Sequence, residues 1–168
     1  MRRLQLSERK KLRGIPRRLR SLSKWAEQFG GCYYPRSAAE ENYIHWKIPV
    51  NSSLANPPHT NKRTQAQCMS HMLRAADLLS QSLPKDYSSY YRVTCLFTLP
   101  WMFSSELTIF YNPEYYLRFF GERHELEPRK LSLEYGFTVP NGFVERGFLV
   151  KDEAARIDEE WWCIGQPI

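Results

Sequence analysis

The sequence predicts an α+β protein, with a mostly antiparallel sheet of about five strands, one long helix and one or two shorter helices. Three observations predict this class. Apolar side chains between residues 62 and 83 recur three and four positions apart, which is the spacing of one helical face. Several later stretches alternate apolar and polar residues, as strands with one buried face do. An Asn-Gly pair at 141–142 separates two such stretches, which indicates an antiparallel hairpin.

Length and composition are those of an ordinary globular protein. The chain has 168 residues, of which 42% are hydrophobic and 25% are charged. We therefore expect one domain over residues 1–168, with residues 1–30 as a basic helical arm packed on it. The apolar runs are too short to cross a bilayer, and no apolar signal segment follows the basic start. We expect a cytoplasmic protein without membrane contact.

The first thirty residues carry the signals of two helices separated by a break. Ser7 can cap a short basic helix from Glu8, which the run Gly14-Ile15-Pro16 interrupts. Proline suits the first turn of the next helix, and Gly30-Gly31 suits its end. The apolar positions of this second helix are Leu19, Leu22, Trp25 or Ala26, and Phe29.

The middle of the chain predicts a strand, a loop and the longest helix. Residues 43–49 suit a short strand, and residues 51–61 are rich in the turn formers Asn, Ser and Pro. The long helix should run from about Lys62 to Leu83 and end before Pro84. Its apolar stripe consists of Met69, Met72, Leu73, Ala76, Leu79 and Leu83.

Two strands and a short helix are expected next. Residues 92–99 alternate apolar with polar side chains and predict a half-buried strand, and residues 107–111 predict a second strand. The run Asn112-Pro113-Glu114 then supplies a helix cap, a first-turn proline and an acid that matches the helix dipole. The helix should continue through Phe120, where Gly121 can end it.

The last third of the chain predicts strands. One strand is expected over 131–139, where alternate positions are apolar, and the turn at 140–142 should join it to a strand over 143–150. Residues 161–164 complete the set as a last strand. The apolar positions of the first of these strands are Leu131, Leu133, Tyr135, Phe137 and Val139.

Charge is concentrated at the two ends of the chain. The net charge is +6, but residues 1–20 hold nine basic side chains against one acidic, so that the remainder carries −2. Residues 151–160 hold two basic and five acidic side chains. Ends of opposite sign can attract each other or attract different partners.

Four stretches of the chain, taken together, carry a family resemblance. They are GIPRRLR at 14–20, Gln67-Cys68 with Leu73-Arg74-Ala75-Ala76, RVTCLFTLPWMFSSELTIFY at 92–111, and the run 116–120. They resemble a family of small bacterial proteins known only as a domain of unknown function. The resemblance covers about two-thirds of the chain and implies no catalytic residue. Small proteins of this kind often resemble the immunity partners of polymorphic or contact-dependent toxins, which is an argument by analogy.

One pair of side chains has the residue types of metal ligands. Cys68 and His71 have the spacing of a ligand pair. A structural zinc site needs four ligands, and no second close pair exists among Cys32, His45, His59, Cys95 and Cys163. We expect reduced thiols, no metal and no cofactor.

Catalytic motifs are missing from the sequence. It contains no phosphate-binding loop, nucleophile elbow, zinc-protease motif or dinucleotide fingerprint. His45 lies near Glu40 and Glu41, and His124 lies between Glu122 and Glu125, but such neighbours are common by chance. We expect no enzyme, although a site assembled only in three dimensions stays open as a third hypothesis.

The C-terminal segment is the favoured contact surface. Asp158, Glu159 and Glu160 precede Trp161 and Trp162. Adjacent strand residues point to opposite faces, so one tryptophan should face away from the core, either as an interface anchor or beneath a second layer. The acids beside it suit a basic partner. We expect a non-catalytic protein-binding protein and, as a finer hypothesis, an immunity protein that occludes the active site of a basic toxin domain such as a nuclease.

The alternative is a nucleic-acid-binding protein that uses the arginine-rich N-terminal helix. Arg13, Arg17, Arg18 and Arg20 could neutralise phosphates, with an affinity that falls steeply with salt. No recognition-helix signature or aromatic single-strand motif accompanies them.

Overall fold

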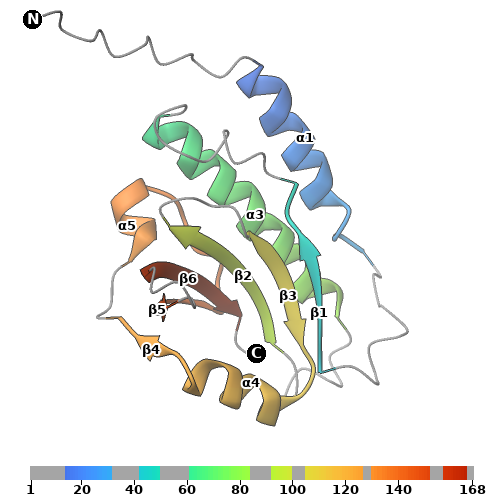
Figure 1. Cartoon of the computed structure of the whole chain (residues 1–168). Coiled ribbons are helices and arrows are strands. Elements are labelled where there is room, and N and C mark those ends of the chain that lie inside the picture. The colour runs from blue at the N-terminus through green and yellow to red at the C-terminus, as the bar shows by residue number, and fades with distance from the viewer. Residues whose placement is uncertain are drawn as a thin grey trace, which may run out of the picture.

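The computed structural model describes residues 14–31, 42–49, 61–83, 92–99, 105–126, 130–151 and 157–165. The strands are β1 (Tyr43–Lys47), β2 (Arg92–Leu99), β3 (Glu106–Phe110), β4 (His124–Glu125), β5 (Phe143–Lys151) and β6 (Ile157–Gly165). The helices are α1 (Ile15–Glu27), α3 (Lys62–Ser82), α4 (Pro113–Gly121) and α5 (Leu131–Tyr135). The strands form one sheet of order β1-β3-β2-β6-β5-β4 in which every pair is antiparallel, so the α+β prediction is confirmed (Figure 1).

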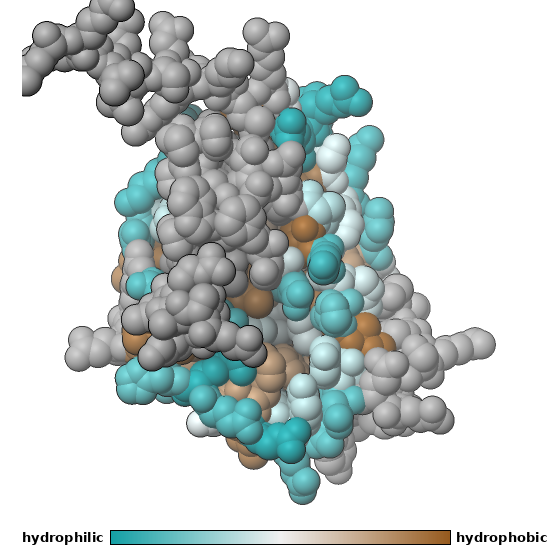
Figure 2. All heavy atoms as spheres, in the orientation of Figure 1, coloured by the Kyte–Doolittle hydropathy of each residue, from teal (hydrophilic) through white to brown (hydrophobic). Residues whose placement is uncertain are grey.

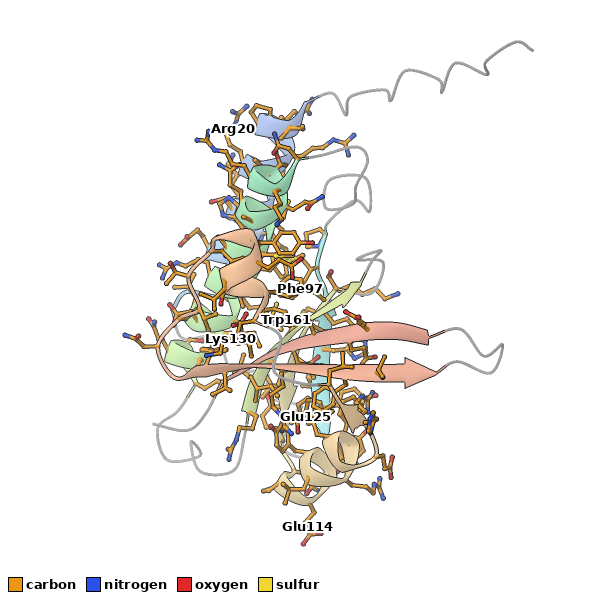
Figure 3. All side chains as sticks on the ribbon, turned by 90° about the vertical axis from the view of Figure 1, so that its left-hand side faces the viewer. Arg20, Phe97, Glu114, Glu125, Lys130 and Trp161 are labelled. Carbon is orange, nitrogen blue, oxygen red and sulfur yellow. The ribbon has the colours of Figure 1, made fainter. Side chains whose placement is uncertain are left out.

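Helices cover both faces of the sheet. Helices α1, α3 and α5 lie on one side of the strands and α4 lies on the other (Figure 3). The two faces alternate along each strand, because successive side chains of a strand point in opposite directions. On β2, Cys95 and Phe97 therefore join the core under α3, whereas Leu96 packs on the α4 side. None of the described helices is both long and apolar enough to span a membrane.

Helix α3 forms where its local signals predict. The Asn61 side chain accepts a hydrogen bond from the Thr64 backbone N–H at 2.9 Å, which caps the first turn. All six residues of the predicted apolar stripe are buried, from Met69 to Leu83. Burial of this stripe against the sheet is the main stabilising contribution of the helix, at about 25 cal/mol for each Å² of apolar surface removed from water.

Helix α1 packs along α3 at the edge of the molecule (Figure 1). Gly14 adopts φ 73° at its start, a conformation that favours glycine, and Leu22 and Ala26 are buried. Phe29 follows the helix and contacts the ring of Trp46 on β1 at 5.6 Å between centroids. The predicted helix from Glu8, and with it Arg13, lies outside the described residues.

Residues 93–97 of strand β2 are buried on both faces, so the prediction of a half-buried strand was wrong there. Thr94 and Leu96, which occupy the face predicted to be polar and exposed, are 0% and 6% exposed. The alternation in the sequence marks two different faces correctly. It carries no information on whether a further layer covers the second one.

Residues 131–135 form helix α5, where the sequence pattern had predicted a strand. Leu131 is fully buried, whereas Leu133 is 81% exposed. Gly136 ends the helix with φ 76°, and the Glu145 carboxylate accepts hydrogen bonds from Ser132 N (2.9 Å) and Ser132 Oγ (2.7 Å). A five-residue helix shows too little periodicity to be distinguished from an alternating strand.

The predicted hairpin at 140–142 was also wrong, because the stretch that should supply its first strand contains helix α5. The turn exists, because Phe143 N donates to Pro140 O at 3.2 Å and Gly142 adopts φ 81°. It leads from α5 into β5, and β5 pairs with β6 and β4 rather than with the preceding stretch. Strand β4, two residues long, was not predicted.

Candidate binding pocket

The C-terminal tryptophans are both inside the protein. Trp161 and Trp162 point to opposite faces of β6 as expected, but they are only 2% and 3% exposed. Trp161 packs on Phe97 at 4.6 Å between ring centroids, in the α3 layer. Trp162 packs on Phe120 of α4 at 5.2 Å. A second layer thus covers the outer tryptophan, and its predicted role as an exposed anchor is corrected.

Of the acidic residues before the tryptophans, Glu160 makes internal contacts. Glu160 accepts hydrogen bonds from Arg123 Nε at 3.1 Å and from Trp162 Nε1 at 2.9 Å, and its side chain is 15% exposed. Glu159 is half-buried, and Asp158 is placed by its backbone pairing with Val150. Glu160 is therefore used inside the protein, where it links β6 to the end of α4.

The sheet face under α4 contains a pocket of about 240 Å³. It lies between the strands β1 and β3 on one side and α4 on the other, and its floor extends to β6. We call it the α4 pocket. Its aromatic lining consists of Tyr43, Phe110, Tyr115, Phe119 and Trp162.

Three polar side chains complete the lining of the α4 pocket. His45 on β1 and Thr108 on β3 are direct cross-strand partners, and Glu106 is the next residue of β3 on the same face. Cross-strand and diagonal neighbours lie within reach of each other's side chains. The pocket therefore offers ring faces together with one carboxylate, one imidazole and one hydroxyl.

The mouth of the pocket is formed by stacked rings. The rings of Tyr43 and Tyr115 are nearly parallel, at 13° and 5.5 Å between centroids. Tyr43 also stacks on the imidazole of His45, at 22° and 5.9 Å between centroids, and lies 6.1 Å from the ring of Phe110. Tyr43 is 39% exposed, so this stack is open to solvent on one side.

Hydrogen bonds between Asn112 and Asn42 tie the two walls of the pocket together. The Asn112 side chain accepts from the backbone N–H groups of Glu114 and Tyr115, at 2.9 and 3.2 Å, and so caps α4 as predicted. Its Nδ2 also donates to Asn42 Oδ1 at 3.0 Å. Since Asn42 directly precedes β1, the start of α4 is fixed relative to the edge strand.

The inner wall of the pocket is fixed by Arg123. Its guanidinium lies 3.6 Å from the centroid of the Phe119 ring, and its NH1 donates to the Phe119 carbonyl oxygen at 2.7 Å. The same guanidinium pairs with Glu160, which in turn holds the indole of Trp162. Two pocket-lining rings, Phe119 and Trp162, are thus held by one network.

The cysteine residues that the structure describes are buried thiols. Burial raises the pKa of Cys68 to about 12 and raises the pKa values of Cys95 and Cys163 well above the ordinary thiol value. His71 has a pKa lowered by burial, with the charge of Glu27 opposing. Among the described residues no three potential ligands come together as a metal site.

The two histidines that have glutamate neighbours in the sequence, His45 and His124, lie in different surroundings. His45 enters the α4 pocket with Glu106, whereas Glu40 and Glu41 lie outside the described residues. His124 is exposed on β4, and its neighbour Glu125 binds Arg146. The pocket combines residues from three separate segments of the chain, and no local motif in the sequence marks it.

The arginines of α1 lie far from this pocket. Arg17 and Arg20 are exposed and Arg18 is half-buried, and hydrophilic side chains gather where α1 lies at the upper right (Figure 2). Arg20 points away from the strands (Figure 3). Arg74 of α3 contacts Glu27 at the end of α1 at 3.7 Å. The basic face and the pocket are therefore separate candidate sites.

Fold and pocket together define the chain as an α+β protein with helices on both faces of an antiparallel sheet and an aromatic pocket under one of them. A comparison with known protein families matches residues 23–166 to the family described as "Protein of unknown function (DUF3916)". The chain belongs to this family. Three of the four stretches that carried the resemblance lie within the match, and 14–20 precedes it. Neither curated proteins nor solved structures yield a match.

Proposed function

We propose that this chain is a non-catalytic protein-binding protein whose contact surface is the α4 face, centred on the α4 pocket. The observation that supports the proposal is the gathering of five aromatic side chains around one opening, with Tyr43 39% exposed at its mouth. Tyrosine, tryptophan and phenylalanine are enriched among residues that dominate binding energy, and they act from partly enclosed sites.

The outer side of α4 extends this surface. Leu117 is 68% exposed on the helix whose inner side covers the sheet. An apolar residue beside an aromatic opening is typical of the buried centre of an interface. In the C-terminal segment, by contrast, Glu160, Trp161 and Trp162 are occupied by internal contacts.

The proposed partner is basic. Glu106 is the only acidic residue among those that line the pocket, and no lysine or arginine lines it. Complementary charge accelerates and orients association. By the analogy with immunity proteins, the first partner to test is a basic toxin domain encoded beside this chain, which the chain would neutralise by covering its active site.

Site-specific photocross-linking tests the proposal. A benzophenone amino acid replaces Tyr43 or Leu117 on the proposed face. Leu133 on the opposite layer serves as the control, because it is also a strongly exposed leucine (81%, against 68% for Leu117). We expect the same partner to be captured in the native host from Tyr43 and from Leu117, and not from Leu133. Capture from Leu133 alone, equal capture from all three positions, or no capture would refute the proposal.

A second candidate function uses the basic face of α1. Arg17, Arg20 and Lys24 are exposed on one helix, and no acidic residue occupies its first turn. Arginines at a helix start oppose the helix dipole, at a cost of about 0.3–1 kcal/mol each. This arrangement favours binding to a polyanion such as RNA or DNA.

Replacing Arg17, Arg18 and Arg20 with glutamine tests the second candidate. If the basic face binds nucleic acid, the wild type should retard RNA or DNA in a gel at low salt, and the triple variant should lose the retardation. The control variant replaces the exposed residues Lys47, Arg63 and Lys130 with glutamine, which removes the same charge elsewhere. An unretarded wild type, or equal loss in both variants, would rule out a site on α1.

A further inference from the structure

The chemistry of the α4 pocket identifies the group that it receives. Resting on the proposed function, we infer that the pocket binds the guanidinium group of one arginine side chain of the protein partner. Glu106 pairs with the guanidinium, and the aromatic lining of the pocket contacts it.

The charge of the lining favours a cation. Among the residues that line the pocket, Glu106 is the only carboxylate, and it lies on a half-buried strand position. Arg123, which holds the inner wall, is paired with Glu160 at 3.1 Å, so its charge is compensated. Lys47 is the cross-strand partner of Glu106, but it is exposed and does not line the pocket. Arg118 lies 5.5 Å from the Tyr115 ring, but it is exposed and does not line the pocket.

The rings of this layer already accept guanidinium groups from the chain itself. Arg123 lies 3.6 Å from the Phe119 centroid, and Arg92 lies 5.8 Å from the Tyr116 centroid. Arg146 lies 5.1 Å from the Phe148 centroid. Guanidinium groups are attracted to ring faces at such distances because the face carries the negative part of the ring quadrupole. The ring of Tyr43, 39% exposed at the mouth of the pocket, offers an external guanidinium an aromatic surface of the same kind.

Arginine fits these surroundings better than lysine. A guanidinium is planar and weakly hydrated, so that it can stack on a ring while its fork of N–H groups pairs with a carboxylate. An ammonium is a strongly hydrated point charge that would lose more solvation in an aromatic pocket. The volume of about 240 Å³ suits one side chain and lies below the roughly 300–1,000 Å³ typical of pockets for whole small molecules.

The test compares three blocked amino acids as probes. N-acetyl-arginine methylamide is titrated against the full chain, beside the citrulline and lysine counterparts. Citrulline has the shape of arginine without its charge, and lysine has the charge without the planar group. Binding is followed by the indole N–H resonance of Trp162, which lines the pocket and donates to Glu160.

We expect saturable shifts with arginine, and binding at least about tenfold weaker with citrulline and with lysine. Glu106→Gln should reduce arginine binding to the citrulline level. Glu122→Gln, which removes an exposed carboxylate just beyond α4 and outside the pocket, should bind arginine as the wild type does. The comparison of arginine with citrulline uses the wild type alone, so it stands even if a variant fails to fold.

Citrulline or lysine binding as tightly as arginine, or no shift with any probe, would overturn the inference. Cross-linking from Tyr43 and Leu117 without arginine binding would leave the protein-binding proposal intact and refute only the arginine assignment. Arginine binding without any cross-linked partner would refute the protein partner and, with it, the assignment of the guanidinium to that partner.

Discussion

Replacing Trp161 with alanine is expected to lower the free energy of unfolding by about 3–5 kcal/mol, the range for truncating a large aromatic residue in a core. Trp161 is 2% exposed and packs against Phe97 and Phe137, at 4.6 and 5.9 Å between ring centroids. Its Nε1 has no hydrogen-bond partner among the described residues, so the loss comes from packing and not from a polar contact. Urea unfolding followed by circular dichroism measures it.

The matched control is Leu133→Ala. Leu133 is 81% exposed on α5, and its truncation should change the free energy of unfolding by less than about 0.5 kcal/mol. If the Trp161→Ala variant is too unstable to isolate, Trp161→Phe provides a smaller truncation at the same site. A cost below about 1 kcal/mol for Trp161→Ala would mean that the tryptophan is not in the core.

Replacing Glu160 with alanine is expected to cost about 2–4 kcal/mol, because it leaves the Arg123 guanidinium without its partner in a place where water cannot fully replace it. The side chains of Arg123 and Glu160 are 21% and 15% exposed. The substitution also removes the acceptor of the Trp162 indole. Since both contacts hold pocket walls, the variant should also bind the arginine probe more weakly than the wild type.

The pair of Glu125 and Arg146 provides the control. It has a similar distance, 2.9 Å, but its side chains are 55% and 34% exposed, so Glu125→Ala should cost no more than about 1 kcal/mol. Hydrogen bonds from Arg146 lower the pKa of the Glu125 carboxyl. The small contribution of this pair to the free energy of unfolding is thus present above the ordinary glutamate pKa. It is lost as the pH falls through the lowered pKa of Glu125.

A double-mutant cycle separates the ion pair from other effects of the substitution. Arg123→Met, Glu160→Ala and the combined variant are unfolded in urea beside the wild type. We expect a coupling energy of at least about 1 kcal/mol, as residues in one hydrogen-bonded network show. Additive losses would contradict an energetic link between the end of α4 and β6.

Elements with strong local signals were predictable from the sequence alone. Asn61 and Asn112 cap α3 and α4 with their own side chains, and the apolar stripe from Met69 to Leu83 has a helical period over several turns. Strands β1, β2, β3 and β5 also formed close to their predicted places, and β6 contains the predicted stretch 161–164 but begins at Ile157. Such features depend on residues that are near in sequence, so their physical cause is contained in a short stretch of chain.

The tertiary structure alone decided what covers each face. Alternation predicts that Trp161 and Trp162 point in opposite directions, but only the position of α4 determines that the second is buried. Leu131 and Leu133 likewise alternate as they would in a strand, but residues 131–135 form a helical turn. Ser132 in this turn donates hydrogen bonds to the Glu145 carboxylate. The α4 pocket joins β1, β3, α4 and β6, whose residues are up to a hundred or more positions apart. Side chains so distant meet only through the strand order, which no local pattern encodes, and for this reason Glu106 and Tyr43 gave no signal in the sequence.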